Sequence, residues 1–423
     1  MAGVGGLRGL VGLLGCDLRT PRSPHRPARS YESDPSAQST ARALRDGRAH
    51  AEEQRALGRP VGRRCTLAGI RVLAFKRVPD HMESGAARRS LIGDSAVAMC
   101  LLCIVGLYVV HAMSFWHYVN DDAYITFRYA ARLAAGLGPY FNEGEHVEGY
   151  TNLLLMLLSS AAIRLLGPAA AAPFAKLIGL LAGAGCVVLA FLLVRALWPK
   201  ERPGSEAASL GSAGLLAVLP SFAINSVSGL ETTLFALLVT WGVYSGVRTA
   251  GHDRMGWGSA ACFALAGLAR PEGFVVFGVF WLCSVAMLAF RRRTAEGEPS
   301  AWTLLRRRGF LGVALAVTAV FSFQIIGRLL VYDGEWLPNT FFAKIGGFSG
   351  ISSWDYVRLG SVTPVFGVPG ILLGLVGLTR LPEPRRIVTP LVVAFFGAAE
   401  PSWAATDWML GWRIVVPYLP LLV

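Results

Sequence analysis

Charged residues are scarce in this sequence: they make up 16% of its 423 positions, whereas 53% of the positions are hydrophobic. From Ser95 to the C-terminal end, apolar runs recur that approach or exceed the ~18 residues expected of a membrane-spanning helix. The runs are continuous and rich in Leu, Ala and Gly, whereas the strands of a transmembrane β-barrel alternate apolar and polar residues. The sequence therefore predicts an all-α, polytopic transmembrane helical bundle and disfavours a barrel.

Acidic residues are scarcer than basic ones, 27 against 40, and the formal net charge is +13. Most of the basic residues lie in the N-terminal segment and in short loops between apolar runs, where the positive-inside rule places them in membrane proteins. The charge therefore does not indicate a nucleic-acid partner. The partner that the composition predicts is the lipid bilayer.

Cysteine is also rare, and the seven cysteines show neither metal-ligand spacing nor a disulfide framework. Cys100 and Cys103 form a C-x-x-C pair, but the pair lies inside an apolar run. We therefore expect both to act as small apolar residues within a span.

Residues 1–90 lack a sustained apolar period and are rich in Arg, Ala, Gly, Pro and Ser, a composition typical of disorder. An alternative is that the protein starts at Met82, so that a short basic lead precedes the first span. We expect residues 91–423 to form the membrane domain. Because the chain stops at Val423 within an apolar run, we expect this domain to be truncated at its C-terminus.

The basic pair Arg88-Arg89 places the N-terminal side of the first span in the cytoplasm. After that span a helix is predicted over 122–136, ended by the glycines and proline of 136–139. The apolar run 153–166 is too short to cross a bilayer, and treating it as an interfacial or re-entrant helix leaves every later basic loop in the cytoplasm. The predicted spans are about 95–117, 171–198, 209–227, 233–247, 257–269, 274–290, 310–331, 364–379 and 387–399, with part of a tenth from 414.

With this topology, every notable polar motif lies on the extracytoplasmic side. The sequence therefore predicts one outward-facing site at the membrane surface, lined by acids and a few cations. Its candidate residues are Asp121, Asp122, Arg128, Glu148, Tyr150, Glu231, Arg270, Glu272, Asn339, Lys344, Asp407 and Arg413.

The adjacent acids Asp121 and Asp122 follow directly after the first span. One interpretation is a general base that takes a proton from an acceptor hydroxyl, or a ligand of a divalent metal such as Mg, Mn or Ca. The other is a helix N-cap with a second acid in the first turn. Arg128 either contacts a phosphate, which suits a guanidinium fork, or extends its charge to the interface.

The other polar motifs have structural alternatives as well. An acid at a helix N-terminus, as at Glu231, is ordinary capping chemistry. Arg270 and Glu272 flank Pro271 and are able to form a structural ion pair. Lys344 either extends to the interface or holds a phosphate, and the pair Asp407 and Arg413 lies beside tryptophans of the kind that anchor spans.

Taken as a set and in their order along the chain, five motifs are specific. They are Asp121-Asp122-Ala-Tyr-Ile-Thr-Phe-Arg-Tyr-Ala with the following Gly-Pro-Tyr-Phe-Asn-Glu-Gly-Glu-His-Val-Glu-Gly-Tyr-Thr-Asn, Gly229-Leu230-Glu231-Thr232, Ala269-Arg270-Pro271-Glu272-Gly273, Pro338-Asn339-Thr340-Phe341-Phe342-Ala343-Lys344, and Asp407-Trp408-Met409. Over about residues 95–423 this set resembles the bacterial GT-C membrane glycosyltransferases. The nearest branch is the one that contains the mycobacterial terminal arabinofuranosyltransferase.

The resemblance implies a multi-pass cell (inner) membrane enzyme with an extracytoplasmic site. It implies transfer of a hexose or pentose from a polyprenyl-phosphate donor to a cell-envelope glycan or lipid acceptor. By the resemblance Asp121 or Asp122 is the base of an inverting displacement. Arg128, Arg270 and Lys344 are the candidates that neutralise the leaving phosphate, and metal use is left open. Two alternatives remain: a transporter or flippase of lipid-linked sugars, which predicts inverted repeats and broken helices, and a non-catalytic membrane protein remnant.

Overall fold

The computed structural model describes residues 85–198, 200–250, 255–293, 309–339 and 416–423, with the single positions 388, 390, 392, 393 and 413. These residues are helical or irregular and contain no strand, which confirms the predicted all-α class. Residues His81–Val423 form one compact unit. The segment predicted to be disordered lies outside the described residues as far as residue 84, as do Lys344 and Asp407.

Four of the described helices are long and apolar enough to cross a membrane. They are α2 (Gly85–Met113), α5 (Ala171–Leu197), α10 (Glu272–Arg293) and α12 (Phe310–Val331). A fifth span is formed if α6 (Ser205–Val218) and α7 (Pro220–Ser226) are counted together. The described residues thus contain four or five of the predicted spans, and the predicted spans after residue 340 lie largely outside them.

The predicted span over 209–227 is broken in the structure, because α6 and α7 meet at an angle of 64°. Pro220 is the first residue of α7, and a proline at that position removes a backbone donor and ends the preceding helix. Two further predicted spans correspond to α8 (Thr232–Ala250) and α9 (Trp257–Ala269). Neither of these is among the described helices that meet the length and apolarity of a span on their own.

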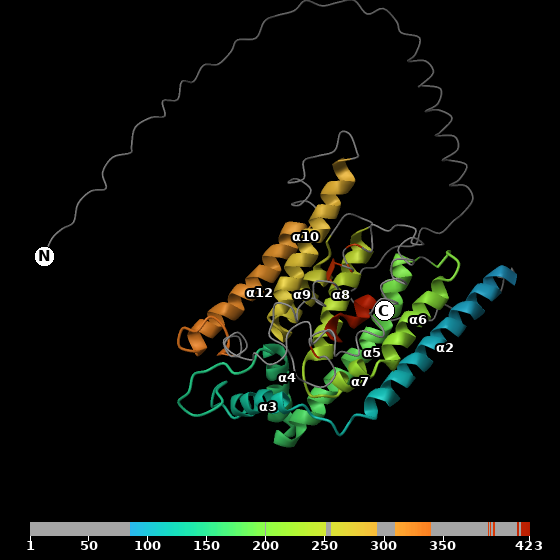
Figure 1. The fold of residues 1–423 in the computed structure, drawn as a ribbon. Coiled ribbons are helices and arrows are strands. Elements are labelled where there is room, and N and C mark those ends of the chain that lie inside the picture. Colours follow the sequence, from blue (N-terminus) through green and yellow to red (C-terminus); the bar gives the residue numbers. More distant parts are fainter. Residues whose placement is uncertain are drawn as a thin grey trace, which may run out of the picture. The chain divides into compact units, whose positions relative to one another are not determined.

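The two helices of the first polar region agree with the sequence to within two residues. They are α3 (Asp121–Ala134) and α4 (Leu153–Leu166). With 14 residues, α4 is about 21 Å long, well short of the ~30 Å hydrocarbon core. Figure 1 shows α3 and α4 together at one end of the bundle, close to the ends of α2 and α7.

Helix α5 lies at the centre of the bundle, between α6 and α2 on one side and α8 on the other (Figure 1). Its glycines permit close approach: a Cβ at Gly179 would lie 2.2 Å from the carbonyl oxygen of Ser226. Thr233 Oγ1 donates to the Gly179 carbonyl oxygen over 2.9 Å. Small residues at such crossings let membrane helices gain packing and hydrogen bonds that larger residues prevent.

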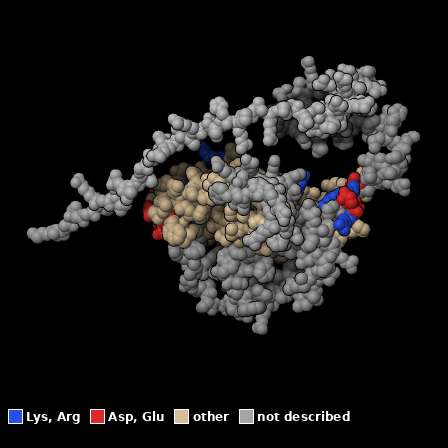
Figure 2. Space-filling view, turned by 90° about the horizontal axis from the view of Figure 1, so that it is seen from above, with Lys and Arg blue, Asp and Glu red and all other residues tan. Residues whose placement is uncertain are grey.

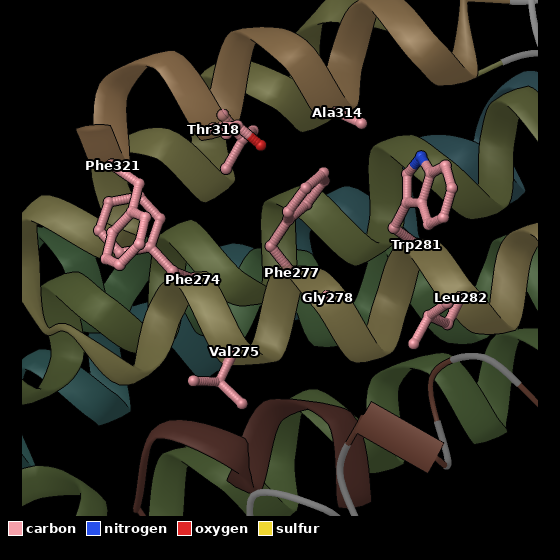
Figure 3. A pocket seen from close by; sticks show the side chains of 10 residues that line it. Phe274, Val275, Phe277, Gly278, Trp281, Leu282, Ala314, Thr318 and Phe321 are labelled. Atoms are coloured by element: carbon pink, nitrogen blue, oxygen red, sulfur yellow. The ribbon is translucent and has the colours of Figure 1, made fainter. Parts of the chain in front are cut away.

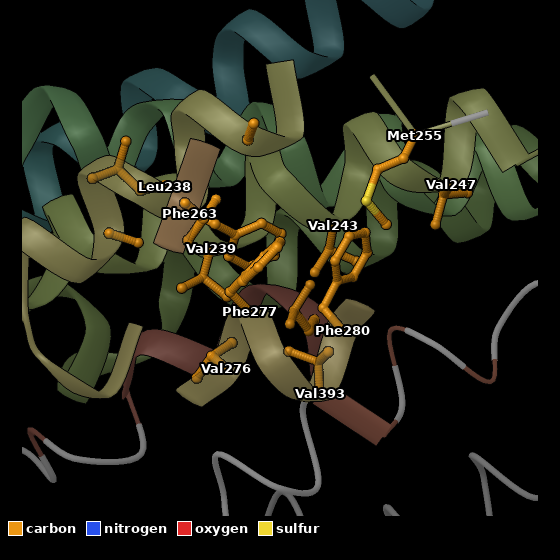
Figure 4. Packing of buried hydrophobic residues seen from close by; sticks show 14 of the residues in the cluster. Leu238, Val239, Val243, Val247, Met255, Phe263, Val276, Phe277, Phe280 and Val393 are labelled. Carbon is orange, nitrogen blue, oxygen red and sulfur yellow. The ribbon is translucent and has the colours of Figure 1, made fainter. Parts of the chain in front are cut away.

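A second packed region joins α8, α9 and α10 through aromatic rings (Figure 4). The ring of Phe263 in α9 lies 4.8 Å from that of Phe280 and 5.6 Å from that of Phe277, both in α10. Tilted aromatic pairs at this spacing are favourable beyond the area they bury. This cluster fixes α10 against the rest of the bundle.

Helices α10 and α12 do not close completely against each other and leave an apolar groove of about 420 Å³. Figure 3 shows the side chains of Phe274, Phe277, Trp281 and Phe321 along it. The indole Nε1 of Trp281 donates to the carbonyl oxygen of Phe310 over 3.0 Å. The groove therefore has one fixed aromatic end near the start of α12.

The surface seen in Figure 2 agrees with a membrane protein. Lys, Arg, Asp and Glu of the described residues show near the edges of this view, and the described atoms visible between them belong to uncharged residues. Large exposed hydrophobic residues include Leu282 and Phe323. Such a surface is stable in lipid and unstable in water.

We expect Gly179→Ala to lower the thermal midpoint of the purified protein in detergent, because the added methyl group meets the Ser226 backbone and overpacking costs about 1–3 kcal/mol. Gly278→Ala is the matched control, since a Cβ there has no heavy atom within 4 Å. Equal midpoints for the two variants would contradict the packing described for α5.

Candidate active site

The acid pair begins α3. Asn120 is the N-cap of this helix, and its Oδ1 accepts from the backbone N–H of Asp122 over 3.0 Å. The backbone N–H of Asn120 in turn donates to Ser228 O over 2.9 Å. The alternative that one of the two acids caps the helix is therefore wrong, and both Asp121 and Asp122 lie in the first turn, where the helix dipole favours negative charge.

The two acids differ in their surroundings. Asp121 is exposed, and its Oδ1 accepts from the backbone N–H of Asp122 over 3.0 Å. Asp122 is partly buried, and its Oδ2 accepts from Arg413 Nη1 over 3.1 Å. Arg413 lies 291 residues after Asp122 in the sequence. This ion pair therefore joins an early and a late segment of the membrane domain.

A buried polar network lies behind α3. Glu231 is 2% exposed, and its Oε2 accepts from Asn152 Nδ2 over 2.8 Å. Asn152 also pairs with the Thr126 hydroxyl of α3. On the other side of Glu231, Arg270 approaches Oε1 to 4.0 Å and forms an ion pair with Glu272. A buried carboxylate needs such partners, so Glu231 links α3, the loop before α4 and the junction between α9 and α10.

A second buried ion pair lies at the end of α12. Arg328 Nε donates to Glu148 Oε2 over 2.6 Å, and both side chains are 5% exposed. Burial raises the pKa of Glu148, and the guanidinium of Arg328 opposes that rise. The backbone N–H of Asn339 donates to the Glu148 carbonyl oxygen over 3.1 Å. The polar loop before α4 is thereby attached to α12.

Tyrosines complete this attachment. The hydroxyls of Tyr150 and Tyr332 lie 3.1 Å apart, and Tyr332 donates to the carbonyl oxygen of Pro139 over 3.0 Å. Burial raises the pKa of both tyrosines, so they stay neutral. Tyr129 donates to Val147 O over 2.7 Å. Within the described residues the Tyr150 hydroxyl thus bonds to Tyr332. The predicted role of Tyr150 in substrate binding stays a prediction.

Two cations were not singled out from the sequence. One is Arg328. The other is Lys176 of α5, which is 5% exposed, donates to the carbonyl oxygen of Trp116 and lies 5.1 Å from the centre of the Trp116 ring. Both residues are charges inside long apolar runs, and in a membrane protein such charges usually have a specific partner or function. This pattern could have identified them from the sequence. Lys176 fixes the segment that leads to the acid pair.

Arg128 takes no part in these networks. Its side chain is exposed, and its Nε donates to the carbonyl oxygen of Phe141 over 3.2 Å. Its guanidinium lies 6.0 Å from the centre of the Phe141 ring. The structure thus brings together Asp122 with Arg413, Glu148 with Arg328, and Glu231 with Arg270 and Glu272. The catalytic and binding roles of all these residues stay predictions.

The described acids do not form a cluster of metal ligands. Within the described ranges, no group of three or more His, Cys, Asp or Glu side chains converges on one point. Asp122, Glu148 and Glu231 each have an arginine within ion-pair distance, whereas hard cations bind several oxygen ligands at once. We therefore derive no step through a metal.

We expect Glu148→Leu and Arg328→Met each to lower stability strongly, because loss of one partner leaves a buried charge uncompensated, at a cost of about 3–5 kcal/mol. The double variant is expected to recover most of that loss, since apolar replacement of a whole buried ion pair is often neutral. Thermal unfolding in detergent measures both, with the exposed Glu145→Gln as control. A double variant as unstable as the sum of the two single ones would refute the pairing.

No family model and no curated protein matches this sequence. Solved structures do match. ArnT from Cupriavidus metallidurans bound to undecaprenyl phosphate superposes with a TM-score of 0.51 and 17% sequence identity, covering 78% of this chain and 59% of that chain. The apo state of the same protein gives a TM-score of 0.49 at 17% identity, covering 80% of this chain and 59% of that chain.

The chain thus spans 59% of the length of the ArnT structures that it matches. At this identity the likeness concerns the fold. ArnT is a polytopic membrane glycosyltransferase of the GT-C type. The described helices have a fold similar to that of ArnT.

Proposed function

We propose that this protein is a membrane glycosyltransferase that moves a sugar from a polyprenyl-phosphate donor to a hydroxyl group of a cell-envelope glycan or lipid. The observation that carries the proposal is the acid pair at the start of α3. It follows the first span directly and lies at the end of the bundle where buried acid–arginine pairs hold the surrounding loops. The GT-C-like fold supports it, as does the undecaprenyl phosphate bound in one ArnT structure.

In the proposed reaction Asp121 is the general base. Its carboxylate is exposed to an incoming acceptor, whereas that of Asp122 is bonded to Arg413. Asp121 takes the proton from the acceptor hydroxyl while the hydroxyl oxygen attacks the anomeric carbon. The bond from that carbon to the phosphate oxygen breaks on the opposite face, through an oxocarbenium-like state and with inversion. The polyprenyl phosphate leaves with the bonding electron pair.

The negative charge of the leaving phosphate has to be stabilised by a cationic side chain that is not already paired with carboxylates of the protein. Arg270 lies between Glu231 and Glu272 and serves to hold the helix junction. Arg128 is exposed two turns after the acid pair on α3, and a guanidinium suits bidentate contact with phosphate oxygens. We assign phosphate contact to Arg128, with Lys344, which lies outside the described residues, as a further candidate.

The apolar groove between α10 and α12 is a suitable place for the polyprenyl chain. Aromatic rings line it, and at Gly278 no heavy atom lies within 4 Å of an added Cβ. Its other end lies at Phe274, close in sequence to Arg270 at the junction of α9 and α10, and at Phe321, two turns before Arg328 in α12. A chain in this groove leaves its phosphate at the end of the bundle that carries the acids.

The finer assignment follows the sequence motifs. We propose that the transferred sugar is a pentose, as in the arabinofuranosyltransferase branch, that the acceptor belongs to the cell wall, and that the site faces the extracytoplasmic side of the inner membrane. A transporter or flippase of lipid-linked sugars is the second candidate, because the 64° break between α6 and α7 is a feature of transporters.

We expect membranes that contain this protein to transfer radiolabelled sugar from a synthetic polyprenyl-phosphate donor. Asp121→Asn is expected to lower that transfer by at least about a hundredfold, the usual effect of losing a general base. Asp122→Asn is expected to lower it less, since Asp122 orients Arg413. The exposed Asp333→Asn is the matched control.

Two results would overturn this assignment. If Asp121→Asn keeps full activity while Asp122→Asn loses it, the two roles are exchanged. If the well-inserted parent protein moves intact labelled donor across the bilayer of sealed vesicles without any transfer, the transporter is correct and the glycosyltransferase is wrong.

The groove assignment has its own test. Gly278→Leu fills the groove from α10, so we expect it to raise KM for a long-chain polyprenyl donor by about tenfold, because several apolar contacts of roughly 0.8 kcal/mol per CH₂ are lost. A donor with one or two isoprene units is expected to show an unchanged KM. An equal effect on both donors would place the chain elsewhere.

A further inference from the structure

Helix α4 presents one exposed face that no other described element covers. The face consists of Leu157, Ala161, Arg164 and Leu165, spaced at helical intervals, and Leu157 and Leu165 are 45% and 81% exposed. Leu166 beyond them is 72% exposed. A largely apolar helix face that is exposed in a protein with several spans indicates contact with lipid.

A cavity of about 630 Å³ opens between this face and the C-terminal end of α3, and the two helices lie together in Figure 1. Its wall is half polar in character. Arg164 and Ser160 line it from α4, and Ala134, Ala135 and Gly136 line it from the last residue of α3 onward. Cavities in lipid-facing surfaces with this composition suit an amphipathic ligand.

The two polar ends of the cavity have opposite electrostatic character. Arg164 has no ion-pair partner within the described ranges, and as an interfacial arginine it suits a phosphate. The end of α3 carries the negative end of the helix dipole. At the C-terminal end of α3, the carbonyl oxygens of Ala131, Arg132 and Leu133 still accept hydrogen bonds from backbone N–H groups.

The carbonyl oxygens of Ala134, Ala135 and Gly136 accept no backbone hydrogen bond from any described residue. Oxygens at a helix C-terminus that are not bonded to their own chain bind cationic N–H donors well. A ligand that fits both ends therefore carries a phosphate and, a few bonds away, an ammonium group with hydrogen atoms to donate.

We propose that this cavity binds the head group of a phosphoethanolamine lipid. Its phosphate lies on Arg164, its ammonium donates to the carbonyl oxygens at the end of α3, and its acyl chains lie against Leu157 and Leu165. A bound lipid at this place ties α3, the helix that begins with the acid pair, to the membrane surface. The site does not depend on the function proposed above.

Native mass spectrometry of the full-length protein in detergent tests the proposal. The probes are an equimolar mixture of phosphatidylethanolamine, phosphatidylcholine and phosphatidylglycerol with identical acyl chains. Phosphatidylcholine keeps the phosphate and the positive charge but has no N–H to donate, and phosphatidylglycerol has no cation. We expect bound phosphatidylethanolamine to exceed each of the others by about tenfold, the difference that one or two charge-assisted hydrogen bonds make.

Arg164→Gln is expected to remove this preference. Its matched control is Arg248→Gln, an arginine near the end of α8 that lies 5.9 Å from the centre of the Tyr244 ring. Ala161→Phe gives an independent variant, because it fills the cavity from an exposed position without changing a charge. Equal retention of the three lipids, preference for phosphatidylglycerol, or a preference unaffected by both Arg164→Gln and Ala161→Phe would overturn the proposal.

Discussion

Buried charges that must be paired determine how one end of this helix bundle is assembled. Glu231, Glu148 and Arg328 are each at most 5% exposed, and an unpaired charge at such a depth costs several kcal/mol. Each pair joins segments that are far apart in the sequence: Glu148 with Arg328 of α12, and Glu231 with Arg270 at the junction between α9 and α10. The polar loop before α4 lies between these pairs, and its position follows from theirs.

This arrangement separates the acids by role. The carboxylates of Glu148 and Glu231 are occupied by arginines inside the protein, so they hold the structure. Asp122 has one arginine partner and is partly exposed, and Asp121 is exposed at the surface. An acid that is to take a proton from an incoming substrate has to be accessible. This gradient of exposure is the reason why we propose the first residue of α3 as the base.

The sequence predicted those elements whose signals are local. The bounds of α3 followed from the acids that begin it and from the glycines and proline of 136–139, and those of α4 followed from the extent of its short apolar run. The break before Pro220 was missed because the apolar run continues through it, although the proline itself was the signal. The sequence motifs also supplied the candidate acids, but all three of Asn120, Asp121 and Asp122 are good caps. The bond from the backbone N–H of Asp122 to Asn120 Oδ1 decides between them.

The partners of the acids were beyond sequence reasoning. Nothing local connects Glu148 with Arg328, because 180 residues separate them. Lys176 and Arg328 are single charges within long apolar runs, where extension of the side chain to the interface is an equally good explanation. Whether such a charge pairs inside the protein or extends to the interface depends on which helix lies next to it. The packing of α5, α8 and α9 around their small residues and aromatic rings determines that neighbour.

The central claim is that a polyprenyl-phosphate sugar binds beside the first turn of α3. Photo-crosslinking tests it directly, with a polyprenyl-phosphate analogue that carries a diazirine next to the phosphate. We expect the crosslinked peptides to come from residues 120–132 and from the end of α12, and excess unlabelled donor to suppress them. Crosslinks confined to the opposite end of the bundle, at the start of α12 or the end of α5, would contradict it.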